Sequence, residues 1–239
     1  MKIVFLDKMT VGEVGNFNLL HKIGKIDIYD HTDHEDIISR AAGKEVIITN
    51  KVEIGQAAMD ALPGLKLICV ASADMNNVDA DYAASRGIEV KNVINYTTES
   101  VAQLTFAMLL HLLNRLNYYD AYVKSGAYGK GGIFTHHGPS FWELSGKRMG
   151  IIGLGNIGRR VAKIAEGFGM EVVFYSTTGR NNNINYKRFD LDTLLSTSDV
   201  ITIHAPLSDS TRNLITLEKI RLMRPLRPKS LGLTRPKPP

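Results

Sequence analysis

The stretch "RMGIIGLGNIGRRVAKIAEGFGMEVVFY", residues 148–175, decides how this chain folds. Its first six residues form an apolar run that predicts a strand, and "EVVFY" (171–175) predicts a second one. Between them, apolar residues recur at helical spacing, with Ile157, Val161 and Ile164 on one face. Strand, helix and strand in this order predict two parallel strands joined by a helix.

Three glycines, Gly153, Gly155 and Gly158, separate the first strand from the helix in the pattern "GLGNIG". Gly153 permits a tight turn, Gly155 lets the backbone approach a pyrophosphate, and Gly158 lets the helix lie close to the strand. The pyrophosphate would bind at the helix N-terminus, at Asn156 and Ile157, where backbone N–H groups and the helix dipole favour an anion. We therefore predict a dinucleotide site on these five residues. The alternative is a glycine-rich turn without a ligand.

The ribose end of this site is expected at the end of the second strand, where proteins that prefer NAD place a carboxylate. This sequence has Ser176 there, and no acidic residue lies between Val172 and Asp190. The serine can donate a hydrogen bond, and Arg180 adds a positive charge. We expect NADP to be accepted at least as well as NAD. The alternative is a surface turn in which Arg180 faces water.

The first hundred residues alternate between apolar, β-branched runs and helix-like stretches. The runs occupy residues 2–6, 25–29, 45–49, 65–71 and 88–92, and the helix-like stretches include 34–42 and 54–62. After the opening stretch, the same rhythm predicts a helix at 191–198, a strand at 199–204 and a helix at 216–223. The alternation predicts an α/β fold with parallel sheets covered on both faces.

Composition and charge separate the last residues from the rest. The chain has 239 residues, of which 44% are hydrophobic and 22% charged, as is typical of a globular protein. Its net charge is +5, but residues 221–239 carry six basic and no acidic side chains, together with five of the eight prolines. A basic end of this kind can bind nucleic acid. Since it has no aromatic residue to stack on bases, we prefer a solvated tail with no nucleic-acid partner.

Several features bear on location and on other kinds of site. Cys69 is the only cysteine, so no internal disulfide is possible and a reducing, cytoplasmic setting fits. Residues 97–125 predict one long apolar helix buried between two domains and, since they include His111, not a membrane span. No metal site is predicted, because "HTDHED" (31–36) precedes a helix-like stretch and is better interpreted as a helix cap.

Together, several segments of this chain resemble the D-isomer-specific 2-hydroxyacid dehydrogenase family. They are "LKLICVA", "RGIEVKN", "TESVAQLTFAMLLHLLNR", "FWELSGKRMGIIGLGNIGRRVAKIAEGFGMEVVFY" and "DVITIHAPLSDSTRNLI". The resemblance implies a flavodoxin-like substrate domain at 1–96 and a partial NAD(P)-binding domain of the Rossmann kind at 97–223, followed by the basic, proline-rich tail at 224–239. It also implies homodimers and an active site in the cleft between the domains.

The resemblance also implies the chemistry. Hydride passes between NAD or NADP and the C2 carbon of a 2-hydroxy or 2-oxo acid, and His204, Pro206 and Thr211 line the dinucleotide. The loop "SADMNN" (72–77) matches the one whose backbone N–H groups receive the substrate carboxylate, at Ala73 and Asp74.

Two positions depart from the family. Relatives commonly have glycine in place of Asp74 and of Asn95. A carboxylate at Asp74 would repel an acidic substrate. The alternative is that Asp74 turns outward and only its backbone matters.

The segment after Met223 departs further. The family implies an arginine for the substrate carboxylate, then a glutamate that orients a histidine, the general acid–base. Neither glutamate nor histidine follows Met223, and Arg235 lacks a preceding apolar strand, so we assign no catalytic residue. The tail resembles a frame shift or premature end, and we expect no turnover from the chain as written. The alternatives are a non-catalytic nucleotide- or partner-binding protein and, third, a nucleic-acid binder acting through the tail.

Overall fold

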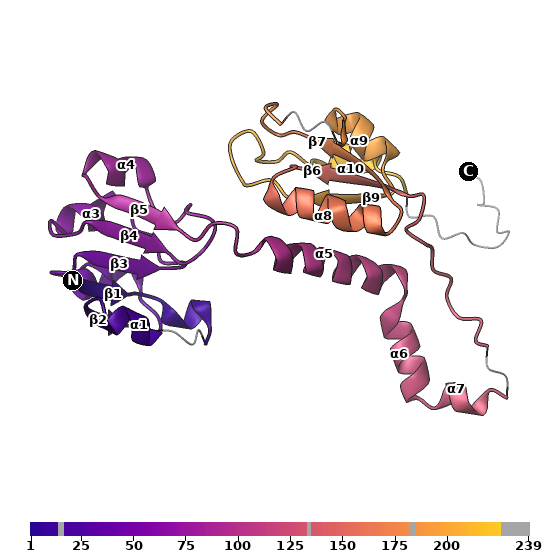
Figure 1. The fold of residues 1–239 in the computed structure, drawn as a ribbon, viewed down its shortest axis with the longest axis horizontal. Helices are drawn as coiled ribbons and strands as arrows, with labels where there is room; N and C mark the ends of the chain where they lie inside the picture. Colours follow the sequence, from indigo (N-terminus) through magenta and orange to yellow (C-terminus); the bar gives the residue numbers. More distant parts are fainter. Residues whose placement is uncertain (14–16, 133–134, 182–184, 226–239) are drawn as a thin grey trace. The chain divides into compact units, whose positions relative to one another are not determined.

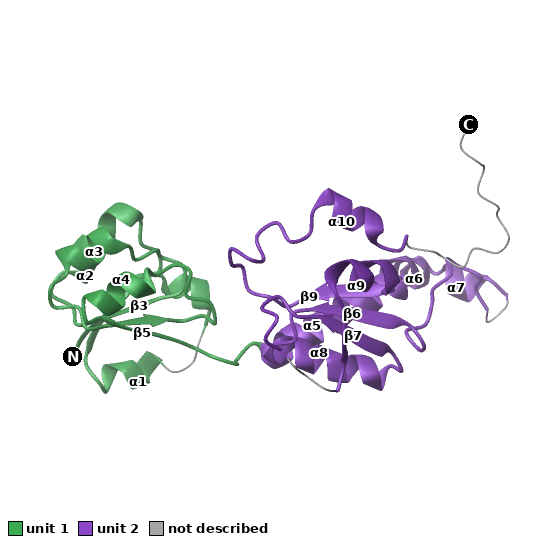
Figure 2. Ribbon diagram, turned by 90° about the horizontal axis from the view of Figure 1, so that it is seen from above, with its two compact units in different colours: residues 1–97 green, residues 98–239 purple. Residues whose placement is uncertain are grey.

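The computed structural model describes residues 1–13, 17–132, 135–181 and 185–225 (Figure 1). Contacts divide the chain into two compact units, unit 1 at Met1–Thr97 and unit 2 at Thr98–Pro239, which are coloured separately in Figure 2. Arg235 and the rest of the basic, proline-rich tail after residue 225 lie outside the described residues.

Unit 1 contains a five-stranded parallel sheet in the order β2-β1-β3-β4-β5. Its strands are β1 (Lys2–Phe5), β2 (Lys25–Ile28), β3 (Val46–Thr49), β4 (Leu67–Val70) and β5 (Glu89–Asn92). The central strands consist of branched apolar residues, because both faces of a parallel sheet are covered. The strand order is that of flavodoxin-like folds, which confirms the predicted fold class for this part.

Helices lie on both faces of the unit 1 sheet. They are η1 (Lys8–Val11), α1 (Phe17–His21), η2 (His34–Asp36), α2 (Ile37–Ala41), α3 (Gln56–Ala61) and α4 (Ala80–Ser85). One core joins α2, α3 and α4 to the sheet through Ile37, Met59 and Ala83, all buried. A smaller core, with Phe5 and Phe17, lies under α1.

Unit 2 contains a four-stranded parallel sheet in the order β8-β7-β6-β9. Its strands are β6 (Arg148–Ile152), β7 (Glu171–Tyr175), β8 (Lys187–Arg188) and β9 (Val200–Ile203). The helices that follow them are α8 (Asn156–Gly167), α9 (Leu191–Thr197) and α10 (Leu217–Leu222). In chain order this arrangement is 3-2-1-4, as in the doubly wound dinucleotide-binding fold, and confirms the predicted Rossmann type.

The prediction of one helix over 97–125 is wrong. The chain forms α5 (Thr98–Leu113) and α6 (Leu116–Lys124), with a short α7 (Ala127–Lys130) after them. The break lies at Arg115, whose φ of 52° places it in the left-handed region. A residue in that conformation cannot continue a right-handed helix, so α6 leaves α5 in a new direction (Figure 1).

Burial of this helix between two domains was also predicted; within unit 2, α5 packs on one face. Ala102 and Phe106 are buried in the core that α5 shares with α8, and Phe106 stacks on Phe168 with 5.4 Å between ring centroids. Other apolar side chains of the helix are exposed, namely Leu104, Met108 and Leu112. The helix is therefore amphipathic in its packing although its sequence is apolar nearly all round.

Candidate functional site

The turn after β6 requires glycine at two positions for steric reasons. Gly153 has φ +91°, and a Cβ there would lie 2.7 Å from the carbonyl oxygen of His204. At Gly158 a Cβ would lie 2.2 Å from the carbonyl oxygen of Gly153. Real Cβ atoms do not approach backbone oxygens this closely, so these glycines let α8 start directly against the end of β6. Both carry the structural roles that the sequence pattern predicted for them.

Gly155 differs from the other two glycines. No atom lies within 4 Å of the position that its Cβ would occupy, and its φ of −79° suits any residue. The packing of the protein therefore gives no reason for a glycine here. Gly155 is the N-cap of α8, so the open space lies beside the first-turn N–H groups of Asn156 and Ile157. This geometry fits a phosphate group, which needs close approach to the backbone and is favoured by the helix dipole.

The loop after β7 is tied to this turn. Asn181 donates from Nδ2 to the carbonyl oxygen of Leu154 at 2.7 Å, and its backbone N–H donates to Ser176 Oγ at 3.3 Å. Ser176 is buried at the end of β7. The predicted ribose end and the predicted phosphate end are thus held side by side. Sequence reasoning missed Asn181, whose role depends on a contact across 27 residues.

Positive charge gathers around the same loop. Arg159, in the first turn of α8, donates to Asn156 Oδ1 at 2.6 Å and also to the carbonyl oxygen of Leu154 at 3.3 Å. Arg180 is exposed, and the described residues give its side chain no carboxylate partner. Arg188, on β8, donates from Nη1 to the carbonyl oxygen of Gly179 at 3.0 Å. Arg159 and Arg188 were not predicted as site residues.

The third predicted segment of the site follows β9. The His204 N–H donates to the carbonyl oxygen of Ile152 at 2.8 Å, so His204 lies beside the glycine turn. Its Nε2 forms a hydrogen bond with Thr202 Oγ1 at 2.9 Å, and burial lowers the pKa of the imidazole, which is therefore neutral near pH 7. Farther along, Thr211 Oγ1 donates to the carbonyl oxygen of Pro206 at 2.7 Å and closes the loop.

All of these predicted dinucleotide residues lie at the carboxyl ends of β6, β7 and β9. In open parallel sheets, ligands bind at this edge, at the position where the strand order reverses. Here β7 and β9 flank β6 on opposite sides, so the reversal occurs at the glycine turn.

The predicted substrate loop lies in unit 1 and is closed on itself. Ser72 Oγ donates to the carbonyl oxygen of Asp74 at 2.6 Å, and the Asp74 carboxylate accepts from the N–H and the side-chain amide of Asn76, at 3.0 and 2.8 Å. Asn92 donates to the carbonyl oxygen of Ala73 at 2.7 Å. Ala73 and Asp74 are exposed. The two departures from the family differ in kind, because Asn95 adopts a φ of 65°, a left-handed conformation that asparagine tolerates.

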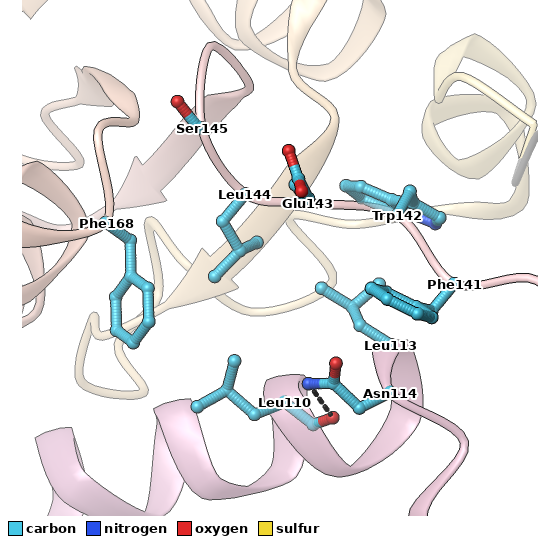
Figure 3. Close-up of a pocket in the computed structure, with 9 residues that line it drawn as sticks. All are labelled: Leu110, Leu113, Asn114, Phe141, Trp142, Glu143, Leu144, Ser145 and Phe168. Carbon is cyan, nitrogen blue, oxygen red and sulfur yellow. Dashed lines mark hydrogen bonds between the residues drawn. The ribbon is translucent and has the colours of Figure 1, made fainter. Parts of the chain in front are cut away.

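Two cavities lie elsewhere. In unit 2, a cavity of about 340 Å³ lies between the end of α5 and the segment before β6, lined by Leu110, Leu113, Asn114, Phe141, Trp142, Glu143, Leu144, Ser145 and Phe168 (Figure 3). Its lining is mainly apolar. Phe168 follows α8 and Ser145 precedes β6, so this cavity is at the sheet edge opposite the glycine turn. In unit 1, a cavity of about 520 Å³ lies under α1.

Other predicted features can be placed as well. No cluster of metal-ligating side chains exists in the part of the chain that the structure describes. Within the same residues, no helix is long and apolar enough to cross a membrane. Burial raises the pKa of the Cys69 thiol, which disfavours the reactive thiolate. At the start of the tail, Arg224 is paired with Asp199 at 3.2 Å.

Comparisons with known proteins identify the family of this chain. The family model "D-isomer specific 2-hydroxyacid dehydrogenase, NAD binding domain" matches residues 106–227. The hydroxypyruvate reductase of Blautia hydrogenotrophica is 33% identical, over 94% of this chain and 71% of that protein. The glycerate dehydrogenase of Methylorubrum extorquens is also 33% identical, over 93% of this chain and 69% of that protein.

A solved structure gives the same result. The D-lactate dehydrogenase of Aquifex aeolicus, complexed with NAD and lactic acid, is 30% identical and aligns with a TM-score of 0.77, over 93% of this chain and 66% of that one. The resemblance found in the sequence segments is thus confirmed. The chain belongs to the D-isomer-specific 2-hydroxyacid dehydrogenase family, whose second domain binds a nicotinamide cofactor.

Proposed function

We propose that unit 2 binds NAD or NADP and that the chain is of the type that moves a hydride between this cofactor and the C2 carbon of a small 2-hydroxy or 2-oxo acid. The observation that carries the proposal is Gly155, where a glycine that packing does not require opens space beside the N-terminus of α8. The relatives named above act on hydroxypyruvate, glycerate and lactate, so compounds of this class are the substrates to test.

The chain's own residues have distinct tasks in this proposal. The N–H groups at the start of α8 hold the pyrophosphate, and Ser176 and Arg180 hold the adenosine ribose. His204, neutral and hydrogen-bonded to Thr202, forms part of the wall beside the glycine turn together with Pro206 and Thr211. The bound dinucleotide supplies the hydride. In unit 1, we assign the substrate carboxylate to the backbone of the loop at Ala73 and Asp74.

For the cofactor, we propose that NADP is bound at least as well as NAD. No carboxylate follows β7 before Asp190, and the loop presents Arg180 instead. A 2′-phosphate carries negative charge. Arg180 attracts it, whereas a ribose-binding carboxylate at the end of β7 would repel it. Titration of the purified chain with NADPH and NADH, for wild type and Arg180→Ala, tests this choice. NADH binding more tightly than NADPH in the wild type would contradict it.

Turnover is tested separately from binding. Oxidation of NADPH and NADH is followed with hydroxypyruvate, glyoxylate and pyruvate as oxidants. A rate above that of buffer would contradict the expectation of no turnover and leave the binding proposal intact.

Finally, we propose that two copies associate through α5. Leu104, Met108 and Leu112 are spaced four residues apart, form one stripe, and are 57%, 54% and 69% exposed. Contiguous apolar stripes of this kind mark interaction surfaces. We expect a homodimer in sedimentation experiments and a monomer for Met108→Glu, whereas Lys124→Glu on α6 serves as the matched control. A monomeric wild type would contradict the proposal.

A cytoplasmic location remains a prediction from the single cysteine.

A further inference from the structure

Arg188 contacts the ribose-binding loop from the neighbouring strand. Position 188 pairs with Phe174 across the parallel ladder of β7 and β8, so it lies beside the carboxyl end of β7. Its Nη1 donates to the carbonyl oxygen of Gly179 at 3.0 Å. Within the described part of the chain it has no carboxylate partner, in contrast to Arg148, which is paired with Glu171 at 2.9 Å.

The contact joins Arg188 to the turn at residues 176–179. Gly179 donates its N–H to the carbonyl oxygen of Ser176 at 3.3 Å and has φ +70°. The N–H of Arg180, the next residue, donates to Thr178 Oγ1 at 3.3 Å. Asn181 anchors the end of the loop to the carbonyl oxygen of Leu154 at 2.7 Å. The exposed turn before it is restrained weakly by these two long hydrogen bonds, whereas the guanidinium–carbonyl bond of Arg188 is charge-assisted and stronger.

We infer that Arg188 is a positioning residue for selection of a 2′-phosphorylated adenosine ribose. It fixes the carbonyl of Gly179, and thereby directs the backbone of Ser176–Arg180 and the Arg180 side chain toward the ribose. The inference rests on the proposed dinucleotide site and adds the residue that makes this site prefer the phosphorylated ribose.

The guanidinium of Arg188 lies against the turn, whereas the ammonium of the neighbouring Lys187 does not. Its Nη2 lies 3.8 Å from the position of an added Cβ on Gly179, so the guanidinium lies along the turn and not away from it. Lys187, the preceding residue on the same strand, points to the other face, where its ammonium lies 5.2 Å from the centroid of the Phe189 ring. The two cations are equal in charge and adjacent in sequence, but only Arg188 contacts the loop.

The test measures dissociation constants of ADP-ribose and of 2′-phospho-ADP-ribose by calorimetry on the 239-residue chain. We expect Arg188→Ala to weaken the phosphorylated ligand about tenfold, the effect of one charge-assisted contact, and ADP-ribose less than about twofold. Arg188→Lys, which keeps the charge and one donor, restores part of the loss. Lys187→Ala is the matched control and should change both constants by less than about twofold.

A double-mutant cycle separates positioning from direct attraction. If Arg188 acts through the loop, its removal has little further effect once Arg180 is alanine. Equal losses for the two ligands, an equal effect of Lys187→Ala, or an undiminished effect in the Arg180→Ala background would each overturn the inference. A wild type that binds both ligands equally also overturns it but leaves the dinucleotide site standing. A wild type that binds neither refutes the proposed function and the inference together.

Discussion

Replacing Gly155 by alanine should separate cofactor binding from folding. The added methyl meets no atom of the protein within 4 Å, and the extended backbone of Gly155 is allowed for alanine. The poorer N-cap costs a few tenths of a kcal/mol or more, and the stiffer unfolded chain offsets about the same amount. We therefore expect the unfolding midpoint to move by less than about 2 °C.

Binding should respond much more strongly to the same change. The methyl occupies the space through which a pyrophosphate reaches the first turn of α8. If two charge-assisted hydrogen bonds of about 1.5 kcal/mol each are lost, the loss is about 3 kcal/mol. This corresponds to a dissociation constant raised by roughly a hundredfold.

Gly158→Ala is the contrasting variant. Its Cβ would lie 2.2 Å from the carbonyl oxygen of Gly153, so the backbone must shift. Overpacking of this kind costs about 2 kcal/mol and lowers the midpoint by about 5 °C. Trp142, the only tryptophan, packs against the core of unit 2 and reports its unfolding by fluorescence. Calorimetry with ADP-ribose reports binding.

Two results would show that Gly155 does not serve phosphate binding. Wild-type affinity for ADP-ribose in Gly155→Ala would mean that no phosphate approaches this glycine. An unfolding midpoint lowered as far as in Gly158→Ala would mean that the fold itself requires glycine at position 155. Either result would remove the observation on which the proposed function rests.

Three further predictions concern stability. Burial lowers the pKa of His204, so below about pH 6.5 the folded state binds fewer protons than the unfolded state. Stability is therefore lost as the pH falls through the lowered pKa. His204→Gln should make the unfolding free energy depend less on pH in urea titrations between pH 7 and 5. The buried Ser198 Oγ has no hydrogen-bond partner among the described residues, so Ser198→Ala should raise the unfolding free energy by about 1 kcal/mol, and a decrease would indicate an unseen partner. Arg115→Gly removes the side chain from a left-handed backbone position between α5 and α6 and should stabilise the chain by up to about 1 kcal/mol in thermal unfolding; destabilisation would show that the arginine side chain is needed.

The parts of the fold that were predictable are those set by local sequence. An apolar run rich in β-branched residues is typical of a covered parallel strand, and the central strands β1, β3 and β4 of the unit 1 sheet are of this kind. The glycine turn was predictable for the same reason, because the requirement for glycine at Gly153 and Gly158 arises within a few residues of the turn or from its adjoining strands.

The break between α5 and α6 had no comparable signal. Apolar residues continue through it at Leu113 and Leu116, and neither glycine nor proline marks the position. The helix ends where Asn114 donates from its side chain to the carbonyl oxygen of Leu110 at 3.0 Å and Arg115 turns left-handed. Arginine is common inside helices, and asparagine alone is a weaker stop signal than glycine or proline, so the sequence does not mark clearly where the first helix ends.

The ribose end of the site shows most clearly why cofactor choice needs the structure as well as the sequence. The sequence shows only that no carboxylate follows β7 before Asp190. The lack of a carboxylate is not sufficient to bind a phosphate. The proposed phosphate site needs donors held in place, and the loop that carries them is held by Asn181 on the glycine turn and by Arg188 on Gly179. β8, which carries Arg188, is only two residues long and gives no periodicity to recognise. If the contact between Arg188 and Gly179 sets the preference for a phosphorylated ribose, then cofactor choice in this chain is a property of the short edge strand as much as of the loop that touches the ribose.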